Sequence, residues 1–134
     1  MRMKKMFFYV LLAGTIVSCC KEGTGGDAIL VVSLKHHDKV IPSQANYLDT
    51  VFVKFNAKEL PGTKPDDFDT YFTGTAGEDH VHLTGLKCGE YFLYGAGLDN
   101  GGGGSPYRVT GGMAVKIKYS DRKDEKNIDL AVTE

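Results

Sequence analysis

Short runs of alternating apolar and polar residues, separated by turn-forming residues, constrain this chain most. They recur along the 134-residue sequence from Ala28 onward, and no stretch shows a helical apolar period of useful length. Alternation with a period of two places successive side chains on opposite faces of a strand. Short strands at regular spacing are typical of an all-β sandwich. We therefore predict a single antiparallel Greek-key β-sandwich of about seven strands over residues 28–134.

The same alternation predicts which side chains face the core. The apolar side chains expected to point inward are Leu30, Val32, Leu34, Val51, Val53, Phe55, Phe68, Phe72, Val81, Leu83, Tyr91, Leu93, Met113, Val115, Ile117, Tyr119, Ile128, Leu130 and Val132. Phe52, Phe92 and Tyr94 have the opposite parity and are expected to face outward. If contiguous and exposed, they would form a binding patch for a protein or glycan partner. The interpretation that we favour is that they lie under neighbouring loops.

The N-terminal segment has a different pattern. Residues 1–5 include three basic side chains, an apolar run fills residues 6–17, and Ser18 precedes Cys19. The apolar run of about 12 residues is too short to cross a bilayer as a helix, which needs about 20. A basic start, a short apolar run and a small residue before the cleavage point are typical of a secretory signal.

The residues Ile16-Val17-Ser18-Cys19 resemble the lipobox of bacterial lipoproteins. The resemblance implies that residues 1–18 are a signal peptide and that Cys19 carries a diacylglyceryl group and an N-acyl chain such as palmitate. Two or more acyl chains hold a protein stably on a membrane. The expected location is the outer membrane of a Gram-negative cell, facing either the periplasm or the cell surface. The Lys21-Glu22 pair is similar to the surface-export signal of Bacteroidetes lipoproteins.

Residues 19–27 are polar and rich in glycine, so we expect a short flexible linker between the lipid and the sandwich. Cys20 and Cys88 are the two remaining cysteines. They could pair in an oxidising envelope, but the bond would pin a residue of the expected linker. We therefore favour unpaired thiols and leave the pairing open, because the distance between the two residues cannot be judged from sequence.

Residues 81–93 read Val-His-Leu-Thr-Gly-Leu-Lys-Cys-Gly-Glu-Tyr-Phe-Leu. This stretch resembles the signature of transthyretin-like (prealbumin-like) sandwiches, a group that includes collagen-adhesin B-type repeats and carboxypeptidase regulatory-like domains. Gly85 and Gly89 permit a tight connection between strands, and Leu86 and Tyr91 are expected to close one end of the sandwich. The resemblance implies a fold, and a fold by itself does not imply a function.

Histidines provide the candidate metal site. His80 and His82 are two residues apart, so on a strand both side chains leave the same face, about 7 Å apart at their Cα atoms. Glu78 has the same parity. Such a pair can bind zinc when a third ligand comes from elsewhere, and the candidate donors are His36, His37 and Asp38. The interpretation that we favour is that alternation alone places polar residues at these positions.

Four consecutive glycines follow Asn100, and no helix follows them, so they do not form a dinucleotide-binding loop. They predict a loop at one end of the sandwich, where binding residues usually lie, and Asp99 and Tyr107 flank it. The chain has no nucleophile motif and no basic cluster for nucleic acid. We therefore expect a non-catalytic binding or structural accessory module for an envelope protein or glycan. The alternative is a small metal- or ligand-binding lipoprotein that uses the His-x-His pair.

Overall fold

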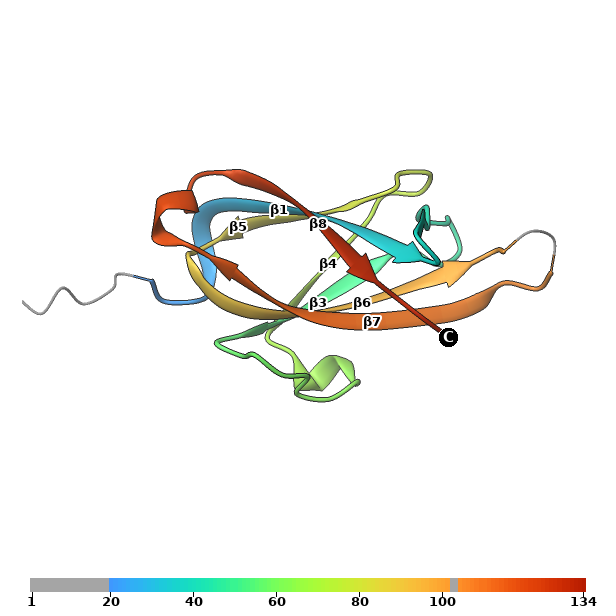
Figure 1. Ribbon diagram of the computed structural model, residues 1–134, viewed down its shortest axis with the longest axis horizontal. Coiled ribbons are helices and arrows are strands. Elements are labelled where there is room, and N and C mark those ends of the chain that lie inside the picture. Colours follow the sequence, from blue (N-terminus) through green and yellow to red (C-terminus); the bar gives the residue numbers. More distant parts are fainter. Residues whose placement is uncertain (1–19, 102–103) are drawn as a thin grey trace, which may run out of the picture.

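Two four-stranded β-sheets make up the computed structural model, which describes residues 20–101 and 104–134 (Figure 1). The first sheet contains β1 (Thr24–His36), β2 (Lys39–Val40), β5 (Val81–Leu86) and β8 (Glu125–Ala131). The second sheet contains β3 (Thr50–Phe55), β4 (Thr70–Thr73), β6 (Gly89–Asp99) and β7 (Tyr107–Ile117). Two short 3₁₀ helices, η1 (Pro65–Asp67) and η2 (Tyr119–Asp121), lie in connections. The described chain is therefore all-β, as predicted.

One pairing differs from the predicted antiparallel arrangement. β1 pairs in parallel with β8, from Ile29 opposite Glu125 to Lys35 opposite Ala131, whereas every other strand pair is antiparallel. The reason is the direction of β7, which ends at the same end of the molecule where β1 begins (Figure 1). β8 starts at that end after η2, so it runs in the same direction as β1.

The inner faces of the two sheets share one hydrophobic core. Of the side chains predicted to point inward, all but Phe68 and Tyr119 belong to this core or pack against it. Phe68 differs because β4 begins at Thr70 and leaves Phe68 in the preceding loop. Tyr119 differs because β7 ends at Ile117, and Tyr119 starts η2 with 53% of its surface exposed.

Aromatic side chains form a second apolar layer on the outer face of the β3–β6 pair. Phe68 stacks on Tyr94 with ring centroids 5.6 Å apart and lies 5.5 Å from Phe52. Phe92 and Tyr94 are only 8% and 6% exposed. These aromatic residues therefore point outward as predicted, but Tyr94 is covered by Phe68, the residue that follows η1. They do not form an exposed patch for a partner.

The segment expected to be a flexible linker is attached to the end of the molecule where the chain turns from β5 into β6. Cys20 forms a disulfide with Cys88, and their two Cα atoms are 4.9 Å apart. The prediction of unpaired thiols is therefore wrong. β1 begins at Thr24, four residues before the predicted first strand. The expectation failed because the chain between Cys20 and Thr24 runs along the β5–β6 turn instead of leaving it.

Tyr91 holds this segment in place from inside the molecule. Its hydroxyl accepts a hydrogen bond from the Gly23 amide at 3.0 Å and donates one to the Lys87 carbonyl at 2.7 Å. The Lys87 amide donates to the Gly23 carbonyl, and the Glu90 amide donates to the Glu22 carboxylate. Burial raises the pKa of the Tyr91 phenol. Tyr91 is thus fully buried at this end of the molecule and fastens the incoming chain.

Cys19 and the predicted signal peptide at residues 1–18 lie outside the described residues. Within the part of the chain that the structure does describe, no helix has the length and apolar character needed to cross a membrane.

Replacing Tyr91 by Phe tests this fastening. The Gly23 amide and the Lys87 carbonyl would lose their partner in a buried place, so we expect the free energy of unfolding to fall by about 1–3 kcal/mol. Urea denaturation measures the change. Tyr71→Phe is the matched control, because the Tyr71 side chain is 63% exposed and its loss should change stability by less than about 0.5 kcal/mol. Equal effects of the two substitutions would contradict the role of Tyr91.

Candidate functional site

A cavity of about 620 Å³ lies where β1 ends, β6 ends and β7 begins. In Figure 1 these strand ends lie at the opposite end of the molecule from the start of β1, the part of the chain that the disulfide holds. One wall comes from residues 36–44, which include the end of β1, the β2 strand and the loop after it. The other wall comes from residues 98–101 and Tyr107, where β6 ends and β7 begins. Both walls are therefore strand ends with their attached turns.

Local chain geometry explains why these residues meet. His37 and Asp38 have φ angles of 51° and 63°, and this left-handed pair turns β1 directly back into β2. On the other wall, Asp99 is the last residue of β6 and stands opposite Tyr107, the first residue of β7. The register of the β6–β7 pair thus places the Asp99 and Tyr107 side chains next to each other.

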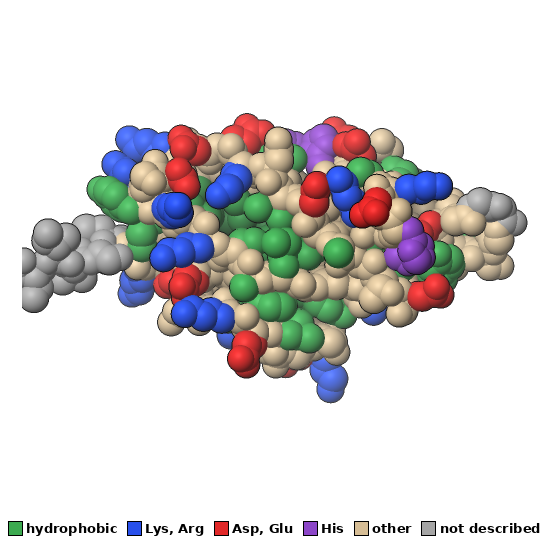
Figure 2. Space-filling view, viewed as in Figure 1, with side chains coloured by type: hydrophobic (Ala, Val, Ile, Leu, Met, Phe, Trp, Pro, Cys, Tyr) green, Lys and Arg blue, Asp and Glu red, His purple; other side chains and the backbone are tan. Residues whose placement is uncertain are grey.

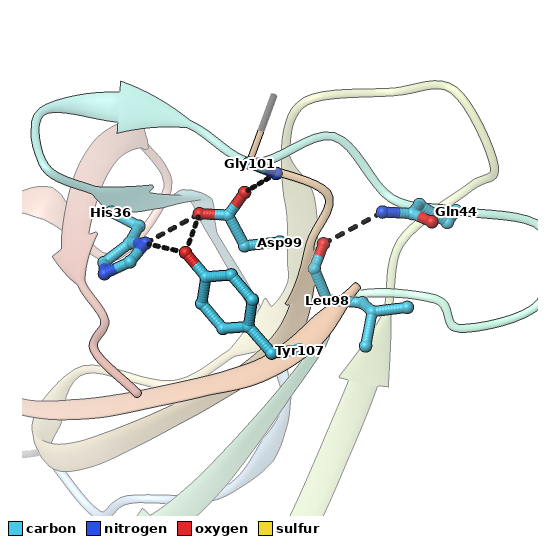
Figure 3. A network of polar contacts seen from close by, with 6 residues as sticks. All are labelled: His36, Gln44, Leu98, Asp99, Gly101 and Tyr107. Carbon is cyan, nitrogen blue, oxygen red and sulfur yellow. Dashed lines mark hydrogen bonds and ion pairs between the residues drawn. The ribbon is translucent and has the colours of Figure 1, made fainter. Parts of the chain in front are cut away.

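A hydrogen-bonded network joins the two walls (Figure 3). The Nδ1 atom of His36 lies 2.6 Å from Oδ2 of Asp99, and the Tyr107 hydroxyl donates to the same oxygen at 3.4 Å. The Gly101 amide donates to the other oxygen, Oδ1, at 2.7 Å. Because a carboxylate can only accept, Nδ1 of His36 carries the proton. His36 is 4% exposed, so this side chain is fixed by both packing and hydrogen bonding.

The network also sets the charge of the site. The hydrogen bond from His36, followed by the one from Gly101, holds the pKa of Asp99 below its ordinary value. Asp99 is therefore ionised at neutral pH. Burial, and then the charge of Asp99, raise the pKa of Tyr107, which keeps its proton and remains a donor.

The cavity combines polar binding groups with apolar side chains. Beside the polar network stand Gln44 and Asn100, together with apolar side chains such as Val40 and Leu98. The Gln44 side chain donates to the Leu98 carbonyl at 3.0 Å and so ties the loop after β2 to β6. A His–Asp pair is also a component of hydrolytic triads, but the described residues that line the cavity include no serine, threonine or cysteine. A few fixed polar groups among apolar ones are typical of a ligand-binding pocket.

Two of the residues that line the cavity are residues that the sequence predicts to bind a partner. Asp99 and Tyr107 were predicted to be binding residues, and the structure brings them together with His36 and His37 in one cavity. The His36–Asp99 pair itself was missed. Its signal lies in the alternation of β1, because His36 has the same parity as the buried Leu34. A polar side chain at an inward position needs a partner, and the partner is Asp99.

The predicted metal residues divide between two places. His80 and His82 lie on the outer side of the first sheet with their rings 4.6 Å apart, and Glu78 approaches His80 at 4.0 Å. His36 and His37 belong to the cavity instead, and Figure 2 shows histidines at two separate places. Among the described residues, no three His, Cys, Asp or Glu side chains form a group that could hold a metal ion. The predicted third ligand is therefore not brought to the His-x-His pair.

One buried carboxyl group lies behind the wall of the cavity. Asp49 is 1% exposed, and its amide donates to the Ser43 hydroxyl at 2.8 Å. Its Oδ1 atom has no hydrogen-bond partner among the described residues and lies close to Gly97 of β6. Burial raises the pKa of Asp49 to about 7. The loop that forms one wall therefore closes over a group that resists ionisation.

Replacing Asp49 by Asn tests whether the buried carboxyl has a raised pKa. The folded state favours the protonated carboxyl, so stability from this group is complete below pH 3.8 and is lost as the pH rises through about 7. Asparagine stays neutral, so we expect Asp49→Asn to be more stable than the parent at pH 8 and similar to it near pH 4. Each unit of pKa shift corresponds to about 1.4 kcal/mol, and urea denaturation at both pH values measures the difference.

Asp66→Asn is the matched control, because Asp66 is exposed in η1. It should show no comparable gain in stability at pH 8. A pH-independent effect of Asp49→Asn would contradict a buried carboxyl with a raised pKa.

Comparison of the chain with known protein families, with curated proteins and with solved structures found no match. The geometry of the cavity and its place in the molecule are therefore what bears on function.

Proposed function

We propose that the chain is an envelope lipoprotein and a non-catalytic binding module. In this proposal, acyl chains on Cys19 hold it on the outer membrane of a Gram-negative cell, and the cavity around Asp99 and Tyr107 binds a protein or glycan partner. The observation that carries the proposal is the placement of two features along the long axis of the molecule. Cys20, the residue after Cys19, is bonded to one end, and the cavity lies at the other end.

We also propose that the two sheets form a transthyretin-like Greek-key sandwich. Supporting this, residues 81–93 span β5, a tight turn and the start of β6. Gly85 and Gly89 have φ angles of 73° and 138°, which favour glycine. A Cβ atom on Gly89 would lie 2.6 Å from the Glu22 side chain, so glycine here also lets the N-terminal segment approach the turn.

The chemistry of the cavity favours a glycan as the first partner to test. Sugar hydroxyls donate and accept hydrogen bonds, and the cavity presents an ionised carboxylate, amide groups and a tyrosine hydroxyl. The Asp99 and Tyr107 side chains are already held in place, so binding would cost little ordering entropy. Val40 and Leu98 add apolar surface to contact the faces of a sugar ring.

Crosslinking tests the binding function. A photoreactive residue placed at Asn100, in the cavity, should give an adduct in cells that produce the full chain. The same residue at Leu60, which is 46% exposed and lies outside the cavity, should give none. Digesting the adduct with glycosidases or with proteases identifies the class of partner.

Asp99→Asn should reduce the Asn100 adduct several-fold, because it removes the charge that orders His36, Gly101 and Tyr107. Equal adducts from the two positions, or an adduct that Asp99→Asn leaves unchanged, would contradict the proposed binding site.

The anchor is tested separately. We expect the full chain to incorporate labelled palmitate and to sediment with membranes, and we expect Cys19→Ser to lose both properties. Cys20→Ser is the matched control, since it removes the neighbouring cysteine and should keep the label. Labelled palmitate on the Cys19→Ser variant would argue against the lipobox.

A further inference from the structure

A small basic cavity lies at the disulfide end of the molecule. Its volume is about 170 Å³, and three separate segments line it: Gly26 and Asp27 of β1, Lys87 and Cys88 of the β5–β6 turn, and Tyr119, Arg122 and Lys123 in and after η2. Three of its lining side chains are cationic and one is acidic. Lysine and arginine side chains also gather at this end in Figure 2, on the left. The cavity therefore carries local positive charge in a chain whose net charge is −1.

One wall of this cavity is an exposed aromatic residue with an arginine over it. The Cζ atom of Arg122 lies 3.9 Å from the centroid of the Tyr119 ring, and Nη1 of Arg122 donates to the Tyr119 carbonyl at 2.9 Å. Tyr119 is 53% exposed. Tyrosine and arginine side chains combine an apolar body with a polar tip, and such side chains suit a membrane–water interface.

The disulfide places this surface next to the proposed anchor. Cys88 lines the cavity and is bonded to Cys20, and Cys19 precedes Cys20 by one peptide unit of about 3.8 Å. The hydrogen bond between Lys87 and Gly23 holds the following residues against the same turn. Acyl chains on Cys19 would therefore enter the bilayer beside the cavity, and no long linker would let the sandwich move away.

We propose that this end of the molecule lies on the membrane and that the cavity binds the phosphate of an anionic lipid headgroup. Lys87, Arg122 and Lys123 supply the positive charge, and Tyr119 sits at the interface. The inference rests on the proposed lipidation of Cys19 and adds a second contact with the same membrane. An anionic membrane surface attracts basic residues held within a short distance of it, and the anchor supplies that proximity.

Docking at this end would orient the whole module. β1 runs from the docked end to the cavity around Asp99, so the long axis would stand away from the bilayer. The partner-binding cavity would then face outward from the membrane.

The chain contains no tryptophan, which makes a single-reporter experiment possible. Tyr119→Trp places one tryptophan in the proposed interface, and Tyr71→Trp places one at a 63% exposed position on β4 in the second sheet. Each lipidated full-length variant is reconstituted into vesicles of phosphatidylcholine and phosphatidylglycerol with brominated acyl chains. We expect the tryptophan fluorescence of Tyr119→Trp to be quenched several-fold more than that of Tyr71→Trp.

The role of charge is tested in the Tyr119→Trp background. Adding Arg122→Gln and Lys123→Gln should lower quenching to the level seen in vesicles of phosphatidylcholine alone. Lys64→Gln, at an exposed position in the loop before η1, is the matched control and should leave quenching unchanged. Inorganic phosphate in the buffer at physiological concentration should not reverse the quenching. Reversal would identify free phosphate as the ligand and overturn the membrane contact.

Mass spectrometry of the same samples distinguishes failure of the membrane docking from failure of the lipid anchor. Acylated Cys19 with equal quenching at the two tryptophan positions would overturn the docking and leave the proposed anchor intact. Absence of acyl groups on Cys19 would overturn the proposed anchor, and the membrane contact inferred from it would fall as well.

Discussion

The disulfide between Cys20 and Cys88 fixes the N-terminal segment to one end of the molecule, which is the end that approaches the membrane in the proposed function. It joins residues 68 positions apart and holds a glycine-rich segment against the two sheets. Tyr91 reinforces it from inside by bonding to Gly23 and Lys87. A crosslink of this kind stabilises chiefly by restricting the unfolded chain. Here it also fixes the position of the chain that precedes Cys20 relative to the two sheets. A lipid on the preceding residue would be attached to a fixed point of the fold.

The same strand connects that fixed point to the candidate binding site. β1 begins next to the disulfide end and terminates at His36, whose side chain bonds to Asp99 in the distal cavity. Its middle is the centre of the first sheet, with β5 on one side and β8 on the other. The spacing between the proposed anchor and the cavity is therefore set by a continuous hydrogen-bonded strand and not by a linker.

Alternation in the sequence was enough to predict the all-β class, and all but two of the side chains that it placed inward belong to the core or pack against it. It failed at Phe68 and Tyr119, because both lie just beyond a strand end, where the period of two no longer holds. Asp99 and Tyr107 could be predicted as candidate binding residues because they flank a run of glycines, which marks a loop at the end of a strand pair. Alternation could also predict that His36 is buried. The disulfide, the parallel β8 and the partner of His36 could not be predicted, since each depends on how distant segments are brought together.

Peptide mapping of the purified full-length product without reduction tests the central claim most directly. Trypsin cleavage after Lys21, Lys87 and Arg108 should release one species in which residues 19–21 carry acyl groups and are joined through Cys20 to residues 88–108. Reduction with dithiothreitol should then separate the two peptides and leave the acyl groups on Cys19. An unacylated N-terminal peptide, or an acylated one whose Cys20 thiol is free before reduction, would contradict an anchor attached directly to the sandwich.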